Sequence, residues 1–231
     1  MWLFTPEETT AILLSLKVAG VVVVAMLPVG VALAWLLARA AFRGKTLVNG
    51  LIHLPLVLPP VLTGYLLLIG FGRKGVAGAL LEQCCGVVFS FRWTGAALAA
   101  AVMGLPLMVR AVRLTIEQAD IRLEKAAATL GASPLRVFFT VTLPLAAPGV
   151  FAGSILAFAK ALGEFGATIT FVSNIPGETQ TLSAAIYTFT QIPGGDAATF
   201  RLVLVAIAIA LAALIASEWF ACRAGMRYHG D

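Results

Sequence analysis

Long uncharged stretches alternate with short charged segments along this chain of 231 residues. A helix that crosses the hydrocarbon core of a bilayer needs about 20 apolar residues, and five stretches meet or approach that length. The pattern predicts transmembrane helices near residues 10–38, 47–72, 92–112, 140–172 and 199–222. We therefore expect an all-α, polytopic membrane protein in which residues 1–231 form a single transmembrane domain.

The composition strengthens this interpretation. Hydrophobic residues make up 60% of the chain and charged residues only 12%, whereas a soluble domain carries about 25% charged residues. Segment 179–195 is also uncharged, but it is rich in Thr, Ser and Gln and ends in Pro193-Gly194-Gly195. It is predicted to form a short helix that lies on the membrane surface or re-enters it.

The basic residues predict the orientation of the chain. Ten of them fall in the loop 39–46, the segment 110–136 and the tail 223–227, whereas the opposite side carries four. Short loops rich in Lys and Arg stay in the cytoplasm, so we expect the N-terminus outside and the C-terminus inside. The net charge of +5 then follows from topology, and no nucleic-acid partner is predicted.

Motifs for nucleotide binding and catalysis are incomplete. Residues 70–75 spell GxGxxG, but they end a predicted span, whereas the dinucleotide motif opens a helix after a strand. Gly44-Lys45-Thr46 would require another glycine at position 39 to complete a phosphate-binding loop, and Arg39 stands there. His53, His229 and the three cysteines form no set of metal ligands. We therefore expect no metal site and no cofactor in this chain.

Two features inside the predicted spans suggest a transport pathway. Pro55, Pro59 and Pro60 interrupt the second span and are followed by Gly64, and broken helices at mid-membrane often line such pathways. Lys160 and Glu164 lie four residues apart in the fourth span, and charges at that depth rarely face lipid. The alternatives are a kink needed only for packing and a neutral ion pair between helices.

A short polar helix interrupts the hydrophobic pattern near 120–131. Asp120 suits its N-cap and Gly131 suits the C′ position after it, while Leu123, Ala127 and Leu130 fall on one face. A helix of this length is marginal alone and needs a groove to dock into. It is predicted either to couple the chain to a soluble partner or to lie as an amphipathic connector on the membrane.

This segment resembles a known motif. "KAAATLGASPLRVFFTVTLP" is similar to the EAA loop of ATP-binding-cassette (ABC) importer permeases, with Ala126, Ala127, Gly131 and Leu143-Pro144 in register. The family's Glu stands directly before the two alanines, where this chain has Lys125, and Glu124 is one residue early. The resemblance implies that the residues which couple the chain to an ATPase are Glu124, Lys125, Ala126, Ala127, Leu130, Gly131 and Pro144.

Other segments resemble the permeases of molybdate importers. These are "HLPLVLPPVLTGYLLL", "LGEFGATITFVSNIPGETQTL" and "IYTFTQIPGG". The resemblance implies a type I ABC importer permease fold, multi-pass in the cell inner membrane, with the N-terminus periplasmic and the C-terminus cytoplasmic. It also implies a homodimer on two cytoplasmic ATPase subunits, which use the ATP, and a periplasmic molybdate-binding protein; tungstate is a related cargo.

The prolines and the charges inside the spans give the candidate pathway or gate residues Pro59, Pro60, Gly64, Lys160 and Glu164. The loop 174–181 lies on the predicted periplasmic face, and its Asn174, Pro176 and Glu178 are expected to contact the binding protein; the alternative is a loop that only closes off the mouth of the pathway. A sulfate or thiosulfate permease of the same architecture remains an alternative. An ion-driven carrier would usually show an inverted repeat, which the five spans lack, and a membrane-embedded enzyme lacks its catalytic residues.

Overall fold

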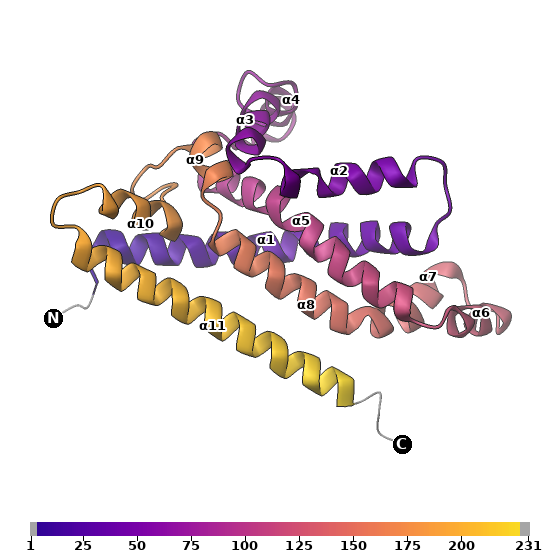
Figure 1. Ribbon diagram of the computed structural model, residues 1–231. Coiled ribbons are helices and arrows are strands. Elements are labelled where there is room, and N and C mark those ends of the chain that lie inside the picture. Colours follow the sequence, from indigo (N-terminus) through magenta and orange to yellow (C-terminus); the bar gives the residue numbers. More distant parts are fainter. Residues whose placement is uncertain (1–3, 227–231) are drawn as a thin grey trace.

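The computed structural model describes residues 4–226, and it describes their side chains except at residue 85 and residues 217–226. Every regular element in this range is helical, which confirms the predicted fold class (Figure 1). In chain order the elements are α1 (Pro6–Arg39), α2 (Lys45–Val57), α3 (Pro60–Phe71), α4 (Val76–Cys85), α5 (Trp93–Gln118), α6 (Ile121–Thr129), α7 (Pro134–Val137), the π-helical turn η1 (Phe138–Thr142), α8 (Leu143–Leu162), α9 (Gly166–Val172), α10 (Leu182–Thr190) and α11 (Asp196–Met226).

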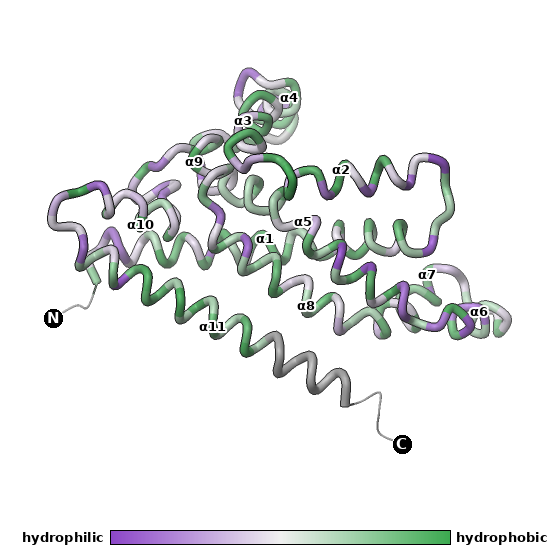
Figure 2. The backbone as a smooth tube through the Cα atoms, in the orientation of Figure 1, coloured by the Kyte–Doolittle hydropathy of each residue, from purple (hydrophilic) through white to green (hydrophobic). Residues whose placement is uncertain are grey.

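Four helical segments in the described part of the chain are long and apolar enough to cross a membrane. They are Pro6–Arg39, Trp93–Gln118, Pro134–Leu162 and Asp196–Ala216, and the pair α2–α3 could supply a fifth crossing. Apolar residues run along α1, α8 and the described start of α11, while hydrophilic residues gather at helix ends and in α6 (Figure 2). This distribution suits a chain whose helices face hydrocarbon and whose connections face water.

Helix α5 packs between α1 and α8 and forms the centre of the bundle. Met108 of α5 packs against glycines of both neighbouring helices. A Cβ on Gly30 of α1 would lie 2.7 Å from Sδ of Met108. A Cβ on Gly153 of α8 would lie 3.1 Å from Cα of Met108. Small residues let helix backbones approach closely inside a membrane, where packing rather than water exclusion holds helices together.

The second predicted span is not a straight helix. α2 ends at Val57 and α3 starts at Pro60, with a bend of 115° between them. A proline disfavours helical geometry in the residue before it, so the Pro59-Pro60 pair ends α2 and begins α3. Pro55 lies inside α2 without breaking it. The interruption predicted within the span 47–72 takes the form of two half-helices, α2 and α3.

The fourth predicted span, 140–172, is also corrected. The helical segment begins earlier, at Pro134, and α8 ends at Leu162. Residues 163–165 form a break, and the apolar stretch after it forms the separate helix α9. Lys160 therefore lies in the last turn of α8, while Glu164 lies beyond its end. Lys160 and Glu164 were predicted to lie inside one span, and the sequence pattern did not show that the helix ends between them.

The short helix predicted within 179–195 is α10, and it packs against other helices of the chain. Leu182 and Ala185 of α10 form a small core with Ala11 of α1 and Leu202 of α11. The start of α1, α10 and the connection between α10 and α11 lie at one end of the bundle, and α6, α7 and the α1–α2 connection lie at the other (Figure 1). The described bundle thus has two distinct ends.

Candidate functional site

The polar helix at one end of the bundle has the local structure that its sequence predicts. The Asp120 carboxylate accepts a hydrogen bond of 2.9 Å from the backbone N–H of Arg122, which caps the start of α6. Gly131 has a φ of +85°, a conformation that glycine adopts without the steric cost of a side chain. Ser133 is the N-cap residue of α7, but its side chain makes no capping hydrogen bond.

Most of the α6 surface is open to solvent. No residue of the helix is buried, and the exposed fraction of Leu130, which follows it, is 88%. Lys125 and Ala126 are exposed, whereas Glu124 and Ala127 are partly covered by the rest of the chain. Because Ala127 shares the side of Glu124, the exposed alanines available to a partner are Ala126 and Ala128.

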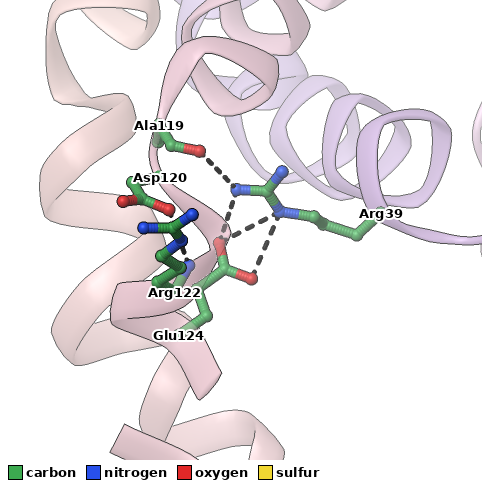
Figure 3. A network of polar contacts seen from close by, with 5 residues as sticks. All are labelled: Arg39, Ala119, Asp120, Arg122 and Glu124. Carbon is green, nitrogen blue, oxygen red and sulfur yellow. Dashed lines mark hydrogen bonds and ion pairs between the residues drawn. The ribbon is translucent and has the colours of Figure 1, made fainter. Parts of the chain in front are cut away.

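A salt bridge joins α6 to α1 (Figure 3). Nε of Arg39 donates to both carboxylate oxygens of Glu124 at 3.1 and 3.2 Å, and Nη2 donates to Oε1 at 2.9 Å. Nη2 also donates to the carbonyl of Ala119, the residue after α5, at 3.3 Å. The side chains of Arg39 and Glu124 are only 14% and 15% exposed. One guanidinium therefore links the ends of α1 and α5 to the first turn of α6.

The path from α6 to α8 is helical from Pro134 onward. α7 leads into η1, whose five residues end at Thr142, and α8 begins directly at Leu143. Pro144 lies in the first turn of α8, where a missing backbone N–H is tolerated. Displacement of α6 would therefore be transmitted to α8 through a short, mostly helical connection.

Lys160 and Glu164 form an ion pair, as the alternative of a neutral ion pair between helices requires. Nζ of Lys160 lies 2.8 Å from Oε2 of Glu164, and the side chains are 28% and 1% exposed. The other carboxylate oxygen of Glu164 accepts a hydrogen bond of 2.9 Å from the backbone N–H of Ala167 in the first turn of α9. Glu164 thus anchors the break between α8 and α9, while Lys160 is the more accessible member.

The two broken segments of the chain pack against each other. A Cβ on Gly64 of α3 would lie 2.5 Å from the carbonyl oxygen of Ala167 in α9, and one on Gly166 would lie 2.7 Å from Cβ of Pro60. The structure therefore brings Pro60 and Gly64 to the segment that Glu164 anchors. Pro59 lies at the bend itself and is exposed.

The three candidate contact residues after α9 differ in their surroundings. Asn174 is partly buried, and its Nδ2 donates to Oγ1 of Thr188 in α10 at 2.7 Å. Pro176 and Glu178 are exposed. Of the three, only Pro176 and Glu178 are fully available to a partner.

The sequence alone did not single out Arg39 as a functional residue. It entered only the count of basic residues on one side and the argument against a phosphate-binding loop, because its acidic partner lies 85 positions away. The available signal was weak: a basic residue at the end of one predicted helix and an acidic residue at the start of another, both on the same predicted side.

Comparison with known proteins shows the family to which the chain belongs. Residues 26–224 match the family described as "Binding-protein-dependent transport system inner membrane component". The chain is 56% identical over 219 residues to the molybdenum transport system permease protein ModB of Escherichia coli (strain K12), covering 95% of this chain and 96% of that one. It is 57% identical over 216 residues to the protein of that name from Haemophilus influenzae, covering 94% of each.

A solved structure shares the fold at much lower identity. It is the crystal structure of a bacterial alginate ABC transporter in complex with an alginate pentasaccharide-bound periplasmic protein. The TM-score is 0.74 at 18% identity, and the match covers 95% of this chain and 80% of the other.

Proposed function

Because the chain belongs to the family of binding-protein-dependent transport system inner membrane components, we propose that it is the membrane-spanning subunit of an ATP-driven molybdate importer. The observation that carries the proposal is the identity of 56% with a molybdenum transport permease over nearly the full length of both chains. The chain itself is a transporter subunit rather than an enzyme, and a separate ATPase hydrolyses the ATP.

We further propose that the chain lies in the inner membrane with its N-terminus in the periplasm and its C-terminus in the cytoplasm. The connection 40–44, α6 and α7 lie together at one end of the bundle (Figure 1). The basic residues near that end include Arg43, Lys45, Arg122, Lys125 and Arg136. Short segments rich in Lys and Arg stay in the cytoplasm, which supports this orientation. In this orientation α6 is within reach of a cytoplasmic partner.

In the proposed assembly, two copies of the chain bind two ATPase subunits and receive molybdate from a periplasmic binding protein. The exposed face of α6, with Lys125, Ala126 and Leu130, docks into the ATPase. Nucleotide-driven movement of the ATPase displaces α6, and the helical connection through η1 passes that displacement to α8. The breaks at Pro59 and at residues 163–165 supply hinge positions at the α3–α9 contact.

The experiment that tests this function is reconstitution. The purified chain is mixed with the ATPase subunit and inserted into liposomes, and uptake of molybdate is measured with loaded binding protein outside and ATP inside. We expect molybdate uptake to require the chain, the ATPase and the binding protein. Tungstate and sulfate are added as competing anions. Failure of the ATPase to co-purify with the chain would contradict the proposal, and preferential uptake of sulfate would replace molybdate as the cargo.

The loop after α9 provides a prediction about the periplasmic partner. We expect a photoreactive crosslinker at position 178 to capture molybdate-loaded binding protein. Glu178 is exposed, and the α9–α10 connection to which it belongs leads to the end of the bundle that also holds the start of α1 (Figure 1). Position 128, on exposed α6 at the opposite end, is the matched control and should capture the ATPase instead. Capture of the binding protein from position 128 would reverse the proposed orientation.

A further inference from the structure

Helix α6 depends on few contacts for its position. It spans nine residues, none of them buried, so hydrophobic burial contributes little to fixing its orientation. The strongest polar contact is the set of three hydrogen bonds from Arg39 to the Glu124 carboxylate, with N–O distances of 2.9–3.2 Å. A guanidinium that binds both oxygens of a carboxylate fixes direction as well as distance.

Both charges also suit the helix ends that carry them. Arg39 is the last residue of α1, where the backbone carbonyls favour a cation, and Glu124 lies in the first turn of α6, where the backbone N–H groups favour an anion. The carbonyl of Ala119 accepts a further hydrogen bond from the same guanidinium. The contact therefore joins three helix ends at one point (Figure 3).

The register of α6 separates the inward and outward charges. Consecutive residues of an α-helix differ by about 100° in direction, so Lys125 points away from the side that carries Glu124. The structure agrees, since Lys125 is exposed and the Glu124 side chain is 15% exposed. With both oxygens held by Arg39, the Glu124 carboxylate is directed at its own chain, and the surface offered to the ATPase carries a cation.

We propose that Arg39 is a positioning residue that makes α6 move together with α1. This inference rests on the proposed role of α6 in ATPase coupling, and it adds a second route for the movement besides the covalent connection to α8. The outer end of α1 is paired in turn with α11, because Arg201 donates to the buried carboxylate of Glu8. A movement that enters α1 at Arg39 therefore also reaches α11.

The test uses the assembled transporter in liposomes, with the amount of molybdate imported per ATP hydrolysed as the readout. A purely structural defect lowers the amount of assembled transporter but leaves this ratio unchanged. We expect Arg39→Gln and Glu124→Gln each to lower the ratio about tenfold or more, the factor that corresponds to loss of one hydrogen bond to a charged group. The double variant should be no worse than either single variant, because both remove the same pair.

Two further variants sharpen the comparison. Arg39→Lys keeps the charge but loses the planar fork, so the ratio should be intermediate. Glu117→Gln is the matched control: it removes the same charge from the exposed pair between Arg113 and Glu117 near the same end of α5, and the ratio should stay at the wild-type value. Losses that multiply in the Arg39→Gln/Glu124→Gln variant, or a normal ratio in Arg39→Gln alone, would overturn the inference.

A second measurement does not need the ATPase. Spin labels at positions 41 and 128, both exposed, report the distance between the end of α1 and α6 in the purified full chain with its cysteines replaced by serine. We expect Arg39→Gln to broaden the distance distribution and Glu117→Gln to leave it unchanged. An unaltered distribution in Arg39→Gln overturns the inference, whereas failure of the wild-type chain to bind the ATPase would overturn the proposed function instead.

Discussion

Gly131→Val is expected to abolish molybdate uptake while the chain remains folded in the membrane. Gly131 follows Leu130, the C-cap residue of α6, and has a φ of +85°; a Cβ placed there would meet nothing within 4 Å. The effect would therefore come from backbone conformation alone. A left-handed conformation costs an L-residue about 1–2 kcal/mol, and a β-branched residue is especially disfavoured. The turn would reorganise and α6 would lose its docking direction.

Two controls separate this effect from general instability. Gly131→Asn should keep most of the uptake, because asparagine tolerates the left-handed region better than other L-residues. Gly44→Val introduces the same strain in the α1–α2 connection, where φ is +94° and the space around the missing Cβ is also open; it should reduce uptake far less. Equal losses in Gly131→Val and Gly44→Val would show that strain at this end of the bundle, rather than the direction of α6, limits transport.

Removing the Glu164 carboxylate is expected to cause the second large effect, a loss of stability. In Glu164→Ala, Lys160 loses its counter-charge and the N–H of Ala167 loses its acceptor. Breaking a buried ion pair by removing one partner costs about 3–5 kcal/mol, and the partial exposure of Lys160 points to the lower end. The midpoint of thermal unfolding in detergent should fall clearly below the wild-type value.

The double variant Lys160→Met/Glu164→Gln then separates structure from transport. It removes both charges and leaves an amide oxygen to accept from Ala167, so thermal stability should recover relative to Glu164→Ala. Molybdate uptake should not recover if Lys160 lines the pathway, where a cation offsets the cost of dehydrating a dianion; Lys160→Arg should retain it. Uptake close to wild type in the stable double variant would assign the pair a structural role only.

Features set by neighbouring residues could be predicted from the sequence. The spans α1, α5 and α11 follow from runs of apolar residues, because the bilayer thickness sets the length that each run must reach. The bounds of α6 follow from Asp120 and Gly131, whose preferences for a cap and a left-handed residue are local. The break near Pro59 follows from the missing donor and the fixed ring of proline.

Features that depend on residues far apart in the chain were decided only by the tertiary structure. The position of the 163–165 break depends on the packing of α9 against α3 and on the hydrogen bond from Ala167 to Glu164. The 115° bend needs neighbouring helices to hold α3 away from the line of α2. The pairing of Arg39 with Glu124 spans 85 residues, and a charge pattern along one chain cannot specify a contact that exists only once α1, α5 and α6 have packed.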